Sequence, residues 1–185
     1  DHSPLPLSHR QELPTMAVAV QFSTIPEMFL KVSAKYARET RPVLMFKADD
    51  VYRNIGYAEL RRKVELFAFG LASLGLRSGD RVAIISENRP EWVISDQAAV
   101  VLGAITVPIY PTMTAKQNQF IFEDAGVRIA IVSNQFQLNK VMRVIDDVKT
   151  LEKVILMSPK GPISEEKTIG FPAVLEMGKS FEPEA

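Results

Sequence analysis

The chain has 185 residues, enough for one substantial domain, and with 46% hydrophobic and 24% charged residues its composition is that of a globular protein. Its 22 lysines and arginines balance its 22 aspartates and glutamates, so there is no electrostatic basis for nucleic-acid binding. It has no cysteine, which excludes disulfides and favours a reducing cytoplasm, and no apolar run reaches the ~20 residues of a membrane span. A peripheral membrane contact stays open.

Residues 1–21 contain three prolines and little periodicity, which predicts a flexible leader. They hold both histidines of the chain, His2 and His9. A two-histidine metal site is less favoured here than a simple tail.

A helix and a hairpin are expected next. Thr24-x-x-Glu27 is a capping box, and it opens a helix with an apolar side formed by Ile25, Phe29, Val32 and Tyr36. Residues 43–46 and 51–55 are extended runs, and the Lys47 to Asp50 link between them predicts a β-hairpin.

The following helix, over residues 57–74, is amphipathic, with one apolar face formed by Leu60, Val64, Phe67, Ala68, Leu71 and Leu74. The Arg61-Arg62-Lys63 cluster is interpreted as its solvated side. Residues 70–75 (GLASLG) resemble a glycine loop but lack the Lys-Ser/Thr of a phosphate cradle, so a core helix is favoured.

A parallel strand–helix–strand unit then occupies residues 81–109. Arg81 to Ser86 is a buried strand, Pro90 opens a helix with Asn88 close enough to cap it, and Gly103 closes that helix. Ile105 to Ile109 runs extended, although proline has no N–H for a central ladder, so either the strand ends at Val107 or its edge is free there.

The alternation continues to residue 157. Thr114-x-x-Gln117 is a second capping box, its helix ends at Gly126, and residues 128–133 and 153–157 form two more strands. Between these strands, helical spacing is shown by Leu138, Val141, Met142, Ile145 and Val148. The sequence therefore predicts an α/β fold, with a mostly parallel, helix-covered sheet beside an N-terminal helix and hairpin. Residues 158–185 are expected to be a linker, with a weak helix at 173–177.

Several segments carry a resemblance. Residues 88–92 (NRPEW) and 102–112 (LGAITVPIYPT) resemble the early part of adenylate-forming ligases, most of all long-chain fatty-acid–CoA ligases. Residues 57–60 (YAEL) are similar to the first core motif of that family, with Gly56 where a hydroxyl residue is usual, and residues 24–29 (TIPEMF) resemble the opening helix of its long-chain members. The resemblance covers residues 22–178. It favours the 102–108 motif ending its strand at the proline and entering a loop.

The resemblance implies a two-step reaction. A fatty acid attacks ATP to give acyl-adenylate and pyrophosphate, with Mg²⁺ on the phosphates, and the CoA thiol then displaces AMP. The catalytic motifs of the family, including its phosphate loop, do not occur in this sequence. We therefore expect residues 22–157 to be the N-terminal α/β subdomain of such a ligase and residues 158–185 a linker toward the absent phosphate loop. No residue is assigned a catalytic, cofactor-binding or metal-binding role, and no bound cofactor is expected.

Two functions stay open. The first is a piece of a long-chain fatty-acid–CoA ligase, inactive alone and prone to self-association through unpaired edges and exposed apolar surface. The second is a complete non-enzymatic α/β module for binding or oligomerisation.

Three positions have local alternatives. Ligands of open α/β sheets bind beyond the carboxyl ends of the strands, which makes Asn88 and Tyr110 candidates for lining a substrate cleft. Trp92 is interpreted as a packing anchor in preference to a ligand gate. Asp49-Asp50 could be the acidic pair of a phospho-receiver, but later strands end without aspartate, so a hairpin turn is favoured.

Overall fold

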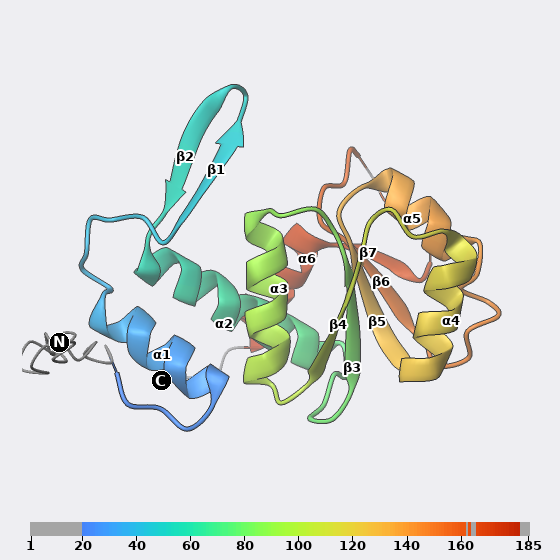
Figure 1. Cartoon of the computed structure of the whole chain (residues 1–185), viewed down its shortest axis with the longest axis horizontal. Coiled ribbons are helices and arrows are strands. Elements are labelled where there is room, and N and C mark those ends of the chain that lie inside the picture. Colours follow the sequence, from blue (N-terminus) through green and yellow to red (C-terminus); the bar gives the residue numbers. More distant parts are fainter. Residues whose placement is uncertain (1–19, 162, 164–165, 182–185) are drawn as a thin grey trace, which may run out of the picture.

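The computed structural model describes residues 20–161, 163 and 166–181, and it shows a helix-covered parallel sheet with a projecting hairpin (Figure 1). Five parallel strands form the main sheet in the order β4-β3-β5-β6-β7. Their bounds are β3 Arg81–Ile85, β4 Ile105–Ile109, β5 Val127–Val132, β6 Lys153–Leu156 and β7 Thr168–Gly170. The predicted α/β class is confirmed. Residues 1–19 of the expected leader, including His2 and His9, lie outside the described part of the chain.

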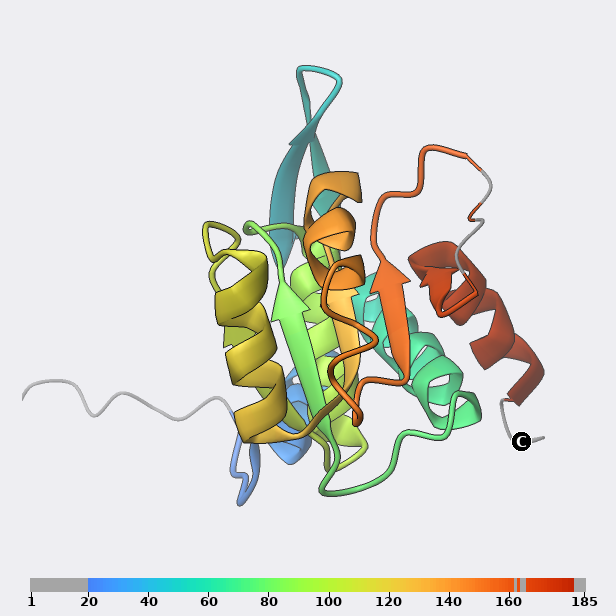
Figure 2. The same cartoon turned by 90° about the vertical axis from the view of Figure 1, so that its right-hand side faces the viewer.

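Helices cover both faces of this sheet, as Figure 2 shows from the side. They are α1 Ile25–Lys35, α2 Tyr57–Ser73, α3 Pro90–Val101, α4 Ala115–Ala125, α5 Gln135–Met142 and α6 Phe171–Phe181. Alternate residues of each strand point to opposite faces. Val82 and Ile84 of β3 join a core with α2, α3 and α6, while Ala83 and Ile85 join a second core with α4 and α5. Because both faces are buried, the strand sequences are almost continuously apolar.

The hairpin β1 (Leu44–Ala48) and β2 (Val51–Ile55) projects away from the helices (Figure 1). Ala48 pairs with Val51, which leaves Asp49 and Asp50 as a two-residue turn. Both aspartates have left-handed backbone conformations, with φ of 50° and 61°. This is the geometry of a type I′ turn, which suits the twist of a hairpin. The structure therefore confirms the predicted turn.

The predicted capping signals set the start and end of α4. The Thr114 hydroxyl accepts the Gln117 N–H at 3.3 Å, and the Gln117 side chain accepts the Thr114 N–H at 2.9 Å. Gly126 ends the helix with φ of 65°. Arg81 adds a feature that periodicity does not reveal, because its guanidinium donates to the carbonyl oxygens of Ala125 and Gly126 at 2.7 and 2.9 Å. Strand β3 thus supplies a cation to the negative end of α4.

Two expectations about the strands are wrong. Pro108 does not end β4, which continues to Ile109. Because β4 is an edge strand and Pro108 is exposed, the missing N–H disturbs no ladder, so the open-edge alternative holds. The expected linker is also wrong, because residues 168–170 form β7, which pairs in parallel with β6. The helix expected at 173–177 does form, as the middle of the longer α6. The prolines and glycines of residues 158–172 obscure a strand only three residues long.

Helix α6 lies against α2 with their backbones in contact. A Cβ atom added to Gly178 would lie 1.9 Å from the Leu66 carbonyl oxygen, and one added to Gly70 would lie 2.1 Å from that of Val174. Beside this crossing the rings of Phe67 and Phe171 stack with centroids 4.2 Å apart. Glycine is required here by space, not by backbone angle.

Helix α5 is shorter than its apolar spacing predicts. It ends at Met142. Ile145 and Val148 lie in the segment of turns that follows the helix, and both side chains are buried there. None of the helices in the described part of the chain is both long and apolar enough to cross a bilayer.

Candidate functional site

The carboxyl ends of β3 and β4 border a hollow of about 470 Å³. Its lining residues are Ser86, Glu87, Asn88, Trp92, Pro108, Ile109, Tyr110 and Pro111. Both residues predicted to line a cleft, Asn88 and Tyr110, therefore lie on the same hollow, Asn88 after β3 and Tyr110 after β4. Tyr110 is 75% exposed and Asn88 is also exposed, so both can contact a ligand. This edge of the sheet is where open α/β folds bind ligands.

A second hollow, of about 710 Å³, adjoins the first. It lies between β1 and residues 87–93, and the two hollows share Glu87, Asn88 and Trp92. Trp92 also packs against the core formed by α2, α3 and α6, which confirms its predicted packing role. It forms part of the wall between the hollows.

Arg89 joins the start of α3 to the ends of two strands, β5 and β6, which sequence reasoning did not find. Its Nε donates to Glu91 Oε2 at 2.7 Å, its Nη1 to the Ser133 carbonyl oxygen at 3.3 Å, and its Nη2 to Ser158 Oγ at 2.7 Å. Ser133 follows β5 and Ser158 follows β6, so one guanidinium connects the start of α3 to both strand ends. Arg89 is separated from Ser133 by 44 residues in the sequence and from Ser158 by 69, so no local sequence pattern indicates these contacts.

Arg89 is also the N-cap of α3, and no side chain caps this helix. The predicted cap, Asn88, is thus wrong by one residue. Pro90 at the first helical position removes one N–H that a cap would satisfy, and Asn88 stays exposed beside the hollow.

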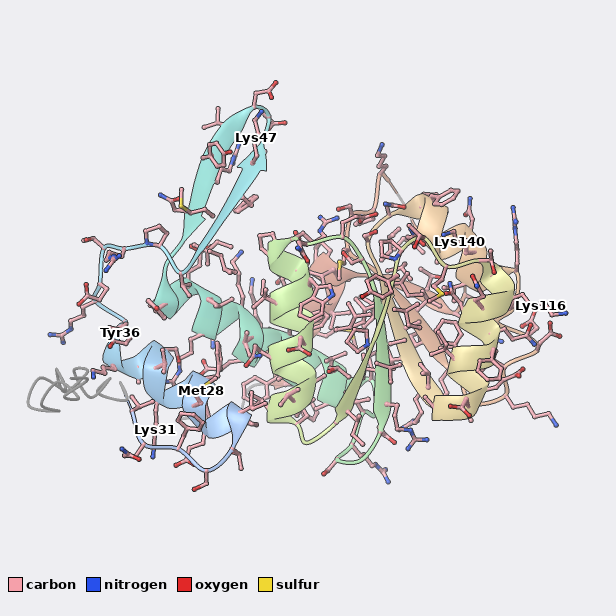
Figure 3. All side chains as sticks on the ribbon, viewed as in Figure 1. Met28, Lys31, Tyr36, Lys47, Lys116 and Lys140 are labelled. Atoms are coloured by element: carbon pink, nitrogen blue, oxygen red, sulfur yellow. The ribbon has the colours of Figure 1, made fainter. Side chains whose placement is uncertain are left out.

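The loop that carries Tyr110 is fastened by α5. Gln137 Nε2 and Lys140 Nζ donate to the Pro111 carbonyl oxygen at 2.9 and 2.7 Å, and Lys140 Nζ also donates to that of Met113 at 2.8 Å. Figure 3 labels Lys140 on α5. The same ammonium lies 4.6 Å from the centre of the Phe136 ring. The wall of the hollow is therefore held from both sides, by Arg89 and by α5.

The lining does not fit a magnesium–nucleotide complex. Glu87 would repel phosphates, and Arg89 is already committed to Glu91 and the strand ends. Within the described residues no group of three or more His, Asp or Glu side chains could hold a metal ion. No step of an adenylation reaction is derived from this site.

Shifted pKa values occur at the opposite, amino end of the sheet. Burial opposes ionisation of Asp80, but hydrogen bonds from the Arg77 N–H and from Arg128 outweigh it and lower the pKa of this carboxyl. The Arg128 guanidinium has its pKa raised, first of all by its bond to Glu152 and against the effect of burial. This ion cluster ties the loop before β3 to β5 and to the residue before β6, and it lies away from both hollows.

Comparison with known proteins places these features in a family. The family model described as AMP-binding enzyme matches residues 31–180. The long-chain-fatty-acid–CoA ligase FadD15 of Mycobacterium bovis is 32% identical over 135 residues, which cover 73% of this chain and 22% of that protein. ACSBG1 of Rattus norvegicus, also a long-chain-fatty-acid–CoA ligase, is 28% identical over 162 residues, or 88% of this chain and 22% of that protein.

Solved structures agree on the fold. The anthranilate CoA ligase AuaEII, solved with anthranoyl-AMP, superposes with a TM-score of 0.70 at 23% identity, over 82% of this chain and 27% of that one. The A-PCP didomain of carboxylic acid reductase from Segniliparus rugosus, solved with AMP, gives 0.74 at 15% identity, over 90% and 28%. The chain spans about a fifth of the length of the curated relatives it matches. With the matched model extending from α1 to α6, the chain belongs to the AMP-binding enzyme family.

Proposed function

We propose that these 185 residues are the N-terminal α/β part of a long-chain fatty-acid–CoA ligase and that they are inactive alone. The whole enzyme converts a fatty acid to acyl-CoA through an acyl-adenylate, using ATP, Mg²⁺ and CoA. The observation that carries the proposal is the family match over residues 31–180, together with the similarity to two long-chain ligases.

The described residues contribute scaffold to this enzyme. Arg89 and α5 hold the loops at the carboxyl edge, and Asn88 and Tyr110 form one wall of an open cleft. A wall with Glu87 and an apolar lining suits the outer part of a substrate cleft better than a phosphate site. The subdomain begins at residue 22 and includes β7 and α6, which complete its sheet and its core, and we infer that the phosphate loop of the whole enzyme follows it. We also propose a cytoplasmic location, with a peripheral contact at the membrane surface left open.

Two experiments test this proposal. In an ATP–pyrophosphate exchange assay with palmitate, the 185-residue protein is expected to give no signal above a protein-free control. Exchange that depends on palmitate and exceeds the control would contradict the proposed inactivity. The coding sequence after Ala185 is then read for a Thr-Ser-Gly-rich phosphate loop within a few tens of residues. A stop codon directly after Ala185 would instead favour the non-enzymatic module.

A further inference from the structure

Helices α4 and α5 carry buried amide groups that lack hydrogen-bond partners. Among the described residues, four buried side-chain atoms have no partner: Asn118 Nδ2 and Oδ1, Gln137 Oε1 and Ser133 Oγ. Three of the four belong to α4 and α5. Asn118 is fully buried and Gln137 is 3% exposed, so bulk solvent does not reach either amide. The described residues produce this burial themselves, so it does not depend on polypeptide outside this sequence.

Asn118 occupies a position where a partner is required. It lies on the inner side of α4, three residues after Ala115 and four before Phe122, and both of these pack in the second core. A buried donor or acceptor without a hydrogen bond loses its hydration and receives nothing in return. Nearly all buried polar atoms in proteins therefore bond to another protein group or to an ordered water.

The two amides lie at the same end of neighbouring helices. Helices α4 and α5 contact each other on one face of the sheet, and both begin at its carboxyl edge (Figure 2). Asn118 is four residues after the N-cap Thr114, and Gln137 is three after the N-cap Asn134. The Gln137 amide is turned toward α4, since its Nε2 donates to the Pro111 carbonyl oxygen in the loop that leads into α4. Packed helix axes lie about 8–10 Å apart, which leaves room for two amide side chains and one water molecule between them.

One water molecule has the hydrogen-bonding groups that all three atoms need. The N–H and C=O of a primary amide lie side by side, so a water can accept from Asn118 Nδ2 and donate to Asn118 Oδ1. Its second proton is then available for Gln137 Oε1. We propose that an internal water molecule binds between the first turns of α4 and α5 in this way. Three hydrogen bonds are the usual number for a buried water.

This water extends the polar network that fastens the loop of Tyr110. Gln137 and Lys140 of α5 donate to the Pro111 carbonyl oxygen, and the water adds α4 to the same network. Loss of the water therefore loosens the side of the 470 Å³ hollow that Tyr110 and Pro111 form. The proposal does not depend on the ligase assignment.

Water–protein NOE and ROE spectra of the 185-residue protein test the proposal. The side-chain amide protons of Asn118 should show water cross-peaks of opposite sign in the two spectra, which identifies a long-lived bound water. Asn139 is the matched control, because it is an exposed asparagine on α5 and meets only rapidly moving surface water. A missing cross-peak at Asn118, or one with the same sign in both spectra, would overturn the proposal.

A double-mutant cycle tests the bridge between the helices independently. Asn118→Leu and Gln137→Leu each remove one end of it, and urea unfolding is measured for both variants and their combination. Residues of one hydrogen-bond network are coupled, so the unfolding constants should depart from additivity on the order of 10-fold. Loss of the Gln137–Pro111 bond occurs on both sides of the cycle and cancels. Asn118→Leu combined with Asn139→Leu is the control pair, which should be additive within about 2-fold.

Circular dichroism confirms that each variant is folded. Additivity of Asn118→Leu and Gln137→Leu within about 2-fold would overturn the bridge, even with a water bound at Asn118. Coupling without a bound-water signal would mean that the two side chains bond directly, which also overturns the proposal. None of these results affects palmitate-dependent exchange or the downstream coding sequence, so the two proposals fail separately.

Discussion

The contact between α2 and α6 offers the sharpest test of the fold. Replacing Gly178 by alanine puts a methyl group 1.9 Å from the Leu66 carbonyl oxygen and 2.8 Å from its carbonyl carbon. Carbon and oxygen approach no closer than about 3.3 Å, so the helices must separate by roughly 1.4 Å. Both contacting atoms belong to helix backbone and cannot swing aside. The separation also loosens the packing of Phe171 and Val174, which are both buried.

The magnitude follows from two opposing effects. Overpacking a core costs about 1–3 kcal/mol, and a backbone clash belongs at the upper end of that range. Alanine favours helix over glycine by about 1 kcal/mol, which offsets part of the loss. We expect Gly178→Ala to lower the free energy of unfolding by about 2 kcal/mol, equivalent to a fall in melting temperature of roughly 4–8 °C for a chain of this size.

Thermal and urea unfolding followed by circular dichroism measure this loss. Ser180→Ala is the control, because it adds alanine at an exposed position of the same helix and should stay within about 0.5 kcal/mol of the parent. If Gly178→Ala unfolds at the same urea concentration as Ser180→Ala, the two helices are not in backbone contact and the reasoning fails.

Three further predictions concern the ends of elements. Thr114→Ala removes the cap of α4 and should cost about 1 kcal/mol in urea unfolding, whereas an unchanged midpoint would mean the capping box contributes nothing. Gly56, the N-cap of α2, has open space around it and a β-region backbone with φ of −82°, so Gly56→Ser should form a box with Glu59 and gain a few tenths of a kcal/mol. The lowered pKa of Asp80 stabilises the fold above the unfolded value of about 3.9, and this contribution is lost as pH falls through the folded value. Unfolding measured between pH 7 and pH 2 should therefore show a smaller acid loss in Asp80→Asn, and an identical pH profile would refute the assignment.

Local signals explain which elements were predictable. Thr114 with Gln117, Gly126, and the Asp49-Asp50 turn each act on their immediate neighbours, so the residues alone define those boundaries. Strand β7 depends on pairing with β6 and has no local signature, whereas α6 has a weak one at 173–177 and owes its full length to close approach to Gly70. Tertiary contacts decided the structure there.

The candidate site was predictable to the same extent. The strand ends gave Asn88 and Tyr110, because parallel strands carry their following loops to one edge. The same rule could not find Arg89, whose partners Ser133 and Ser158 follow strands that are distant in the sequence. The prediction of Asn88 as a helix cap had a different basis, the capping preference of asparagine near Pro90, and it was wrong because Arg89 takes that position. Whether any described residue touches substrate stays a prediction.

The position of Trp92 has a practical consequence. It is the sole tryptophan of the chain, and it stands where the two hollows meet while its other side contacts the core. The intrinsic fluorescence of the protein therefore comes from one known place and needs no attached label. A quencher such as acrylamide is expected to reach this indole from the side of the hollows, which Trp92 lines. Loss of quenching on adding a ligand, or on raising protein concentration, would show directly that the mouth of the cleft has been covered.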